Sequence, residues 1–282
     1  TLMEKTTNEF DYELMNTTLK FLLPAMDARD AKSASYDCFG KLEIVEDLIS
    51  MYKYGSDISM INESPVGSVV KIADSTFECL QSAFAACEMS GGAIDITMGE
   101  FFMKNKGVDR YGKIETPRRG KFAFDDENYY VKKLEEGKMD LGAIGKGYAL
   151  DKVAEILEDT WGVKNAFVSF GASSVYAVGR DENGEEWRVN LSDDVYVPLD
   201  GAFVGASGTA VLGEHIIDCR TGEIPQNQPF RAWAFSGNGA ISDAMSTAFM
   251  ILSRKEVADI CAKYDISAAI QQTADSPVEF ID

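Results

Sequence analysis

Residues 140–151 read DLGAIGKGYALD, and the interpretation of the rest of the chain starts from this stretch. Glycines at positions 142, 145 and 147 let the backbone approach a ligand closely at the point where a helix begins. The stretch is not a Walker A loop, because Lys146 is followed by Gly147 rather than by Ser or Thr, and it contains no GxGxxG. Taken alone, it is explained equally well by a strand-to-helix turn that binds nothing.

The composition is that of a globular protein and argues against nucleic acid as a partner. The chain has 282 residues, 45% of them hydrophobic, and a formal net charge of −19, whereas a phosphate backbone is bound by positive patches. A dinucleotide would need local compensation by a metal, a helix N-terminus or a lysine. The five cysteines form no CxxC, and one histidine, His215, cannot make a histidine-rich metal site. No run of about eighteen apolar residues predicts a membrane span.

The pattern of apolar residues predicts an α+β fold. Helices are expected at four places by spacing and caps: residues 74–90, 146–161, 242–253 and, shorter, 42–51. For the first of these the expected N-cap is Asp74 or Ser75 and the expected end is Gly91-Gly92. Strands are expected where β-branched and aromatic residues gather: residues 165–170, 174–178, 187–191, 202–205, 215–218 and 231–235. Strands that cluster as hairpins favour α+β over alternating α/β.

No composition shift marks a domain boundary, so the chain is predicted to be a single domain, residues 1–282. Residues 107–128 are polar and rich in loop formers, and we interpret them as an insertion.

A possible metal site lies in residues 241–248, ISDAMSTA. Asp243 and Thr247 are spaced i, i+4, so both project from one face of a helix, with Ser246 beside them. A carboxylate and hydroxyls suit Mg²⁺, which takes few protein carboxylates and completes its shell with water and phosphates. The alternative interpretation is that Asp243 only caps its helix and Thr247 only packs.

Two further segments are each explained equally well without a function. Residues 213–225, GEHIIDCRTGEIP, read as a strand that runs into an Arg-Thr-Gly turn, and residues 90–99, SGGAIDITMG, as a helix end followed by an extended segment. Their order along the chain carries more information. Together with residues 50–62, SMYKYGSDISMIN, residues 140–151 and the Asp243 helix, they make a chain that resembles the ApbE family of FAD-dependent FMN transferases. The resemblance covers about residues 26–253 and leaves residues 1–25 as an N-terminal extension.

The resemblance implies an ApbE-like α+β fold with mixed sheet subdomains, packed helices and a cleft for FAD. It also implies a flavin transferase that moves FMN from FAD to a Thr or Ser hydroxyl of an acceptor protein, with Mg²⁺ at the pyrophosphate and release of AMP. By position, the metal ligands would be Ala143, Asp243, Ser246 and Thr247. The residues that line FAD would be Met26, Tyr52, Ala93, Ile94, Asp95, Asp140, Lys146 and Ile217. His215 and Asp243 are the expected catalytic residues, with His215 as the general base.

Three alternatives remain open. One is an FAD pyrophosphatase that yields FMN and AMP, another a non-catalytic FAD-binding relative, and the third a generic α+β domain without a ligand. Relatives have Gly-Gly-Asp where this chain has GASS at residues 171–174, and proline where it has Cys219. The expected partner is a flavin-acceptor protein of a redox complex, with membrane association only through a lost lipid anchor. The expected location is the cell envelope if a signal peptide was removed, and otherwise the cytoplasm.

Overall fold

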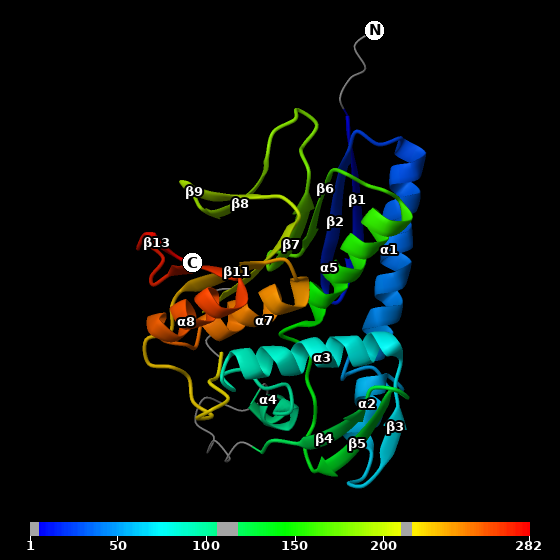
Figure 1. Ribbon diagram of the computed structural model, residues 1–282, viewed down its shortest axis with the longest axis vertical. Coiled ribbons are helices and arrows are strands. Elements are labelled where there is room, and N and C mark those ends of the chain that lie inside the picture. The colour runs from blue at the N-terminus through cyan, green and yellow to red at the C-terminus, as the bar shows by residue number, and fades with distance from the viewer. Residues whose placement is uncertain (1–5, 106–117, 210–215) are drawn as a thin grey trace.

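An eight-stranded antiparallel sheet forms the centre of the molecule (Figure 1). The computed structural model describes residues 6–105, 118–209 and 216–282. The strands of this sheet are, in chain order, β1 (Thr7–Leu14), β2 (Thr17–Pro24), β6 (Ala166–Phe170), β7 (Ser174–Val178), β10 (Ala202–Gly208), β11 (Arg231–Ser236), β12 (Ser267–Gln271) and β13 (Val278–Ile281). Their spatial order is the same as their order in the chain, and each neighbouring pair is antiparallel.

Helices cover one face of this sheet, and a β-hairpin covers the other. On the helix side lie α1 (Ala28–Ile49), α5 (Gly145–Glu155) with its π-helical end η1 (Ile156–Thr160), and α7 (Gly239–Phe249) (Figure 1). The hairpin consists of β8 (Trp187–Ser192) and β9 (Val195–Leu199). Successive side chains of β11 point to opposite faces of the sheet. Ala232 and Ala234 belong to the core cluster under α7, whereas Trp233 packs with Trp187 of the hairpin.

A second layer of smaller elements lies below α7 in Figure 1. It contains α2 (Asp57–Glu63), α3 (Asp74–Met89), α4 (Gly99–Asn105) and a three-stranded sheet of β3 (Val69–Lys71), β5 (Tyr130–Glu135) and β4 (Lys121–Asp125). Apolar residues of α3, including Leu80 and Ala83, share one core cluster with Ala244 and Ala248 of α7. Helix α8 (Arg254–Tyr264) follows α7. None of the described helices is long and apolar enough to cross a membrane.

The predicted α+β class is confirmed, and so are most of the predicted elements. The helix predicted over residues 74–90 is α3, followed by Gly91 and Gly92 in positive-φ conformations. The predicted cap is wrong. Ala73 occupies the N-cap position, and its N–H donates to the carboxylate of Asp57 at 2.8 Å. Asp57 of α2 thus contributes to the start of α3, and Asp74, one residue inside the helix, accepts from Ser75 N at 2.7 Å.

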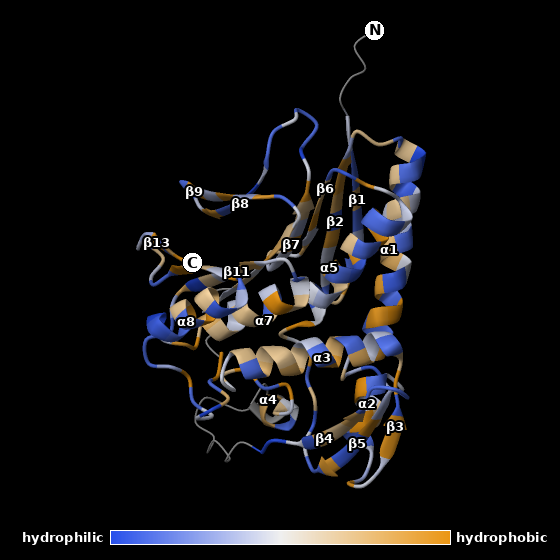
Figure 2. Ribbon diagram, in the orientation of Figure 1, coloured by the Kyte–Doolittle hydropathy of each residue, from blue (hydrophilic) through white to orange (hydrophobic). Residues whose placement is uncertain are grey.

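Several helices and strands begin or end at residues other than those predicted. Helix α1 runs for 22 residues where only residues 42–51 were predicted, because its first half buries small residues such as Ala31, Ala34 and Ser35 that give little apolar signal (Figure 2). Helix α7 begins at Gly239 and ends at Phe249, and Ser253 instead caps α8. Residues 216–218 form no strand; Asp218 makes only an isolated bridge to Glu223.

The first and last strands of the described residues form the two edges of the main sheet. Residues 1–25 were predicted to be an extension, but β1 and β2 form one edge of the eight-stranded sheet, and β13 forms the other. Part of the region predicted as a loop insertion, residues 107–128, is β4 of the small sheet.

Candidate functional site

A pocket of about 480 Å³ opens between α3, α7 and the glycine-rich segment that precedes α5. This volume is in the range of pockets that bind small molecules and cofactors. Its apolar wall includes Ala83 and Ala86 of α3, together with Ile94, Ile96, Ile216 and Ile217 of two loops. Its polar groups are those of Asp95, Asp140, Lys146, Ser173, Ser207, Asp243 and Thr247. The pocket therefore combines an apolar surface with polar groups, which suits a ligand that has both an aromatic ring and a charged group.

The glycine-rich segment forms the N-terminal end of α5 at this pocket. The Asp140 carboxylate accepts a hydrogen bond from Gly142 N at 2.8 Å, which closes the turn before the helix. Ile144 holds the N-cap position and offers no side-chain cap; in the first turn, Gly145 N donates to the carbonyl of Leu141 at 2.9 Å and Gly147 N donates to Asp243 at 2.7 Å. Gly147 must be glycine, because a Cβ at this position would lie 2.0 Å from the carbonyl oxygen of Gly239. The positive end of the α5 dipole therefore lies at the pocket, with the Asp243 carboxylate beside it.

Asp243 lies on α7 beside this helix start. Its Oδ2 accepts a hydrogen bond from Gly147 N at 2.7 Å, and its Oδ1 accepts one from Ser174 Oγ at 2.6 Å. The residue is 6% exposed. Burial raises the pKa of Asp243 to about 6, although both hydrogen bonds and the charge of Lys146 act in the opposite direction. This carboxylate is thus buried at the pocket with Lys146 as its nearby cation.

Asp243 does not cap its own helix. Helix α7 begins at Gly239, and the side chain of Asn238 accepts the capping hydrogen bond from Ile241 N at 2.8 Å. Asp243 lies in the second turn, so the alternative interpretation of it as a cap is wrong. Its carboxylate instead faces a different helix, α5.

The structure brings three of the four predicted metal ligands to the pocket. Ala143, Asp243 and Thr247 line it, and Ser207 Oγ lies 3.1 Å from Thr247 Oγ1. Ser246 does not line it, because its hydroxyl is buried and donates to the carbonyl of Asp243 at 2.8 Å. The described residues contain no cluster of three His, Cys, Asp or Glu side chains that could hold a metal. Any ion here would rest on one carboxylate, a hydroxyl and a carbonyl.

The residues predicted to line FAD divide into two groups. Those at the pocket are Ile94, Asp95, Asp140, Lys146 and Ile217, and Ala93 is buried directly beside Ile94. Met26 and Tyr52 lie elsewhere: Met26 packs against the cluster formed by β2, α1 and α5, and Tyr52 is 65% exposed between α1 and α2. His215 lies outside the described residues.

Lys146 is the lysine at the pocket. It occupies the first turn of α5 and is half-buried, rather than fully exposed as its place at a helix start suggested. Within residues 6–105, 118–209 and 216–282, its ammonium forms neither a hydrogen bond nor an ion pair. A cation at a helix N-terminus without a partner is available to an anionic ligand.

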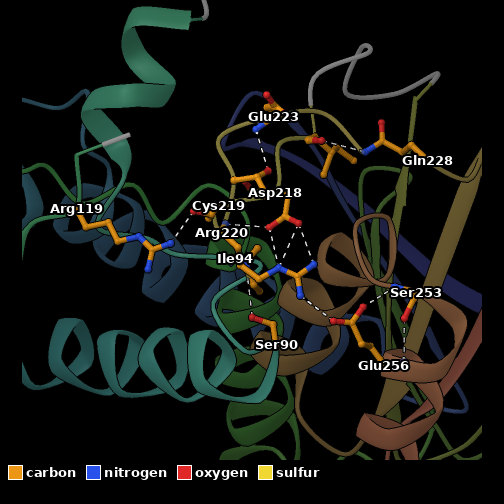
Figure 3. A network of polar contacts seen from close by, with 12 residues as sticks. Ser90, Ile94, Arg119, Asp218, Cys219, Arg220, Glu223, Gln228, Ser253 and Glu256 are labelled. Atoms are coloured by element: carbon orange, nitrogen blue, oxygen red, sulfur yellow. Dashed lines mark hydrogen bonds and ion pairs between the residues drawn. The ribbon is translucent and has the colours of Figure 1, made fainter. Parts of the chain in front are cut away.

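A polar network fixes the loop that carries Ile216, Ile217 and Cys219 (Figure 3). Arg220 forms a bidentate pair with Asp218, at 3.0 Å and 2.8 Å, and also contacts Glu256 of α8 at 2.7 Å. The arginine thus ties the turn to α8.

Further hydrogen bonds with Arg119, Ala93 and Gln228 hold residues 216–219 in place. Arg119 donates to the carbonyl of Cys219 at 2.7 Å, and Cys219 N donates to the carbonyl of Ala93 at 3.0 Å. Gln228 donates to the carbonyl of Ile216 at 3.0 Å (Figure 3). Residues 216–219 therefore supply an apolar wall that Arg119, Asp218 and Arg220 help to hold in place.

Sequence reasoning missed the serines of the site. Ser174 donates to Asp243, Ser173 lines the pocket, and Ser207 contacts both Ser246 and Thr247. Both serines belong to the GASS stretch at residues 171–174, where the resemblance implied Gly-Gly-Asp, and this expected departure was a usable signal. Ser207 had none, because only the pairing of β10 with its neighbours brings it to α7.

Known proteins resemble this chain over most of its length. The model of the ApbE family matches residues 15–270. The FAD:protein FMN transferase of Vibrio cholerae is 23% identical over 260 residues, 80% of this chain and 75% of that protein. The enzyme of the same name from Escherichia coli K12 is 21% identical over 277 residues, 87% of this chain and 78% of that protein.

Solved structures show the same fold. The apo flavinyl transferase ApbE of Pseudomonas stutzeri superposes with a TM-score of 0.84 at 22% identity, covering 100% of this chain and 97% of that one. The flavin transferase ApbE of Vibrio cholerae gives a TM-score of 0.82 at 20% identity, covering 98% and 96%. With the family match extending over residues 15–270, this chain belongs to the ApbE family.

Proposed function

We propose that this protein is an FAD:protein FMN transferase, which moves FMN from FAD to a Thr or Ser hydroxyl of an acceptor protein and releases AMP. The observation that supports it most is the meeting of Lys146, the N-terminus of α5 and the buried Asp243 carboxylate at one pocket with an apolar wall. Curated relatives of this chain carry this activity as their name.

The residues present fit a magnesium ion. The Asp243 carboxylate forms no ion pair within the described residues, and burial disfavours its charged form, which a cation would favour. Ala143 and Thr247 supply a carbonyl and a hydroxyl at the same pocket, and Mg²⁺ uses such oxygen ligands together with substrate phosphates. Ser246 would join them only if its hydroxyl left the carbonyl of Asp243.

The remaining groups have roles that follow from their chemistry. When bound, Mg²⁺ would withdraw charge from the phosphoryl oxygens and favour the departure of AMP. Lys146, at the positive end of α5, would bind the pyrophosphate. The apolar wall around Ile94 and Ile217 would hold a ring system of FAD.

The transfer breaks the phosphoanhydride of FAD and forms a phosphoester on the acceptor hydroxyl. The acceptor hydroxyl oxygen bonds to the phosphorus of the FMN half, the bond from that phosphorus to the bridging oxygen breaks, and AMP leaves with that oxygen. The hydroxyl proton needs a base. His215 stays our prediction for this role.

The proposal is tested by incubating the protein with FAD, MgCl₂ and flavin-acceptor proteins of a redox complex. We expect AMP by chromatography and a fluorescent flavin that stays on the acceptor after denaturing electrophoresis. Release of AMP together with free FMN, and no flavin on the acceptor, would show that the protein hydrolyses FAD instead of transferring FMN. Binding of FAD without AMP would leave a non-catalytic flavin protein, and no FAD binding would reject the proposal.

A further inference from the structure

Helices α5 and α7 cap each other with carboxylates. Asp151 of α5 accepts hydrogen bonds at both oxygens from the first turn of α7, from Gly239 N at 2.6 Å and from Ala240 N at 2.9 Å. Asp243 of α7 in turn accepts one from Gly147 N, in the first turn of α5, at 2.7 Å. We call these three hydrogen bonds the reciprocal clamp. Each carboxylate lies at the positive end of the other helix.

The two helices cross with their backbones in contact. A Cβ on Gly147 would lie 2.0 Å from the oxygen of Gly239, and a Cβ on Gly239 would lie 2.3 Å from the oxygen of Gly147. No side chain fits between them at this crossing. The hydrogen bonds of the reciprocal clamp are therefore the directional contacts that fix how the two helix starts meet.

Asp151 itself stays away from the ligand. It does not line the pocket, whereas Asp243, Lys146 and Ala143 do. Burial raises the pKa of Asp151 to about 6 and Glu155 adds to this, while the two N–H groups and Lys152 act against it. Cys79 of α3 is the other titratable group that senses this carboxylate. Asp151 is thus a half-buried carboxyl that the roles assigned so far leave unused.

We infer that Asp151 is a positioning residue of the site: by holding the first turn of α7, it sets the Asp243 carboxylate against the start of α5. This inference rests on the proposed function, since it assigns Asp243 to the metal. It makes metal-dependent FAD binding sensitive to a residue that touches neither FAD nor metal.

The test compares two carboxylates that do the same structural work at different places. Asp151→Asn puts an amide N–H₂ against one of two backbone N–H donors, so one hydrogen bond of the reciprocal clamp is lost. Asp57→Asn is the control, because Asp57 likewise holds the start of another helix: it accepts from Ala73 N and from Thr76 Oγ1 at the start of α3. Unfolding midpoints are recorded first, and all titrations are run well below the lowest.

The measurement is flavin fluorescence at fixed FAD against MgCl₂ concentration. We expect the Mg²⁺ concentration at half-maximal FAD binding to rise about tenfold or more in Asp151→Asn, and less than twofold in Asp57→Asn. Amide exchange without ligand should also rise at Gly147 in Asp151→Asn, because loosening one half of the reciprocal clamp loosens the other.

Two results would overturn the inference: an unchanged Mg²⁺ dependence in Asp151→Asn, or an equal rise in both variants. If Asp151→Asn does not fold, Asp151→Glu keeps the charge but lengthens the side chain, and the same rise in required Mg²⁺ is expected. If the parent protein shows no Mg²⁺-dependent FAD binding at all, the proposed function fails instead. The amide exchange at Gly147 then still decides whether the clamp is coupled.

Discussion

Replacing Asp243 by asparagine should separate metal binding from folding. The buried carboxyl has a pKa of about 6 against an ordinary 3.8, so at neutral pH its ionised form costs about 3 kcal/mol relative to the unfolded chain. Asparagine removes that cost but gives up a charge-assisted hydrogen bond of about 1.5–3 kcal/mol. Its amide can still accept from Gly147 N and donate to Ser174 Oγ.

These effects nearly cancel, so we expect the ligand-free Asp243→Asn variant to melt within about 4 °C of the parent protein. The loss of the anionic ligand should cost about 1.5–3 kcal/mol of Mg²⁺ binding, roughly 10- to 100-fold in concentration. The assay is thermal unfolding with FAD, with and without MgCl₂. Asp200→Asn is the control, since Asp200 accepts from Gly179 N outside the pocket. Full Mg²⁺-dependent stabilisation by FAD in Asp243→Asn would refute the assignment of this residue to the metal.

Four further outcomes follow from the same geometry. FAD should bind more tightly than FMN by calorimetry in MgCl₂, because the pyrophosphate and adenylate add contacts to the start of α5; equal affinities would contradict this. Lys146→Ala should weaken FAD binding by about 1.5–3 kcal/mol without unfolding the protein, and unchanged affinity would make Lys146 a surface lysine. Gly147→Ala should lower the unfolding free energy by more than about 3 kcal/mol, since the new Cβ would clash with the backbone of Gly239. A melting temperature equal to that of the parent would show that α5 and α7 can separate enough to accept the methyl group. The raised pKa of Asp151 means that its stabilising contribution is present below about pH 4 and is lost as pH rises through about 6, so the parent should lose up to about 3 kcal/mol of unfolding free energy relative to Asp151→Asn over that range. Parallel pH profiles in urea unfolding would count against that.

The elements that could be predicted from the sequence are those whose signal is local. Helix α3 shows apolar spacing and a Gly-Gly end, and strands such as β6 and β7 carry β-branched and aromatic residues. Helix α1 was only half predicted, because it buries alanine and serine where a long apolar stripe was looked for. The place of the β1–β2 hairpin in the main sheet depends on contacts across about 145 residues, from β2 to β6.

The site divides in the same way. The glycine-rich segment and the Asp243 helix could be assigned because their chemistry is written in consecutive residues. Ser174 and Asp151 could not, because each acts through a partner about 70 to 90 residues away. Met26 and Tyr52 were carried over by position from the resemblance, and the fold places them away from the pocket that holds Lys146.

The most direct test of the account is the product formed from FAD. The protein is incubated with FAD and MgCl₂, with and without an acceptor protein, and AMP and FMN are separated by chromatography. The account predicts AMP that requires Mg²⁺ and Asp243, matched in amount by FMN on the acceptor. FAD that binds but stays intact with acceptor and Mg²⁺ present, or AMP release that survives in Asp243→Asn, would contradict it.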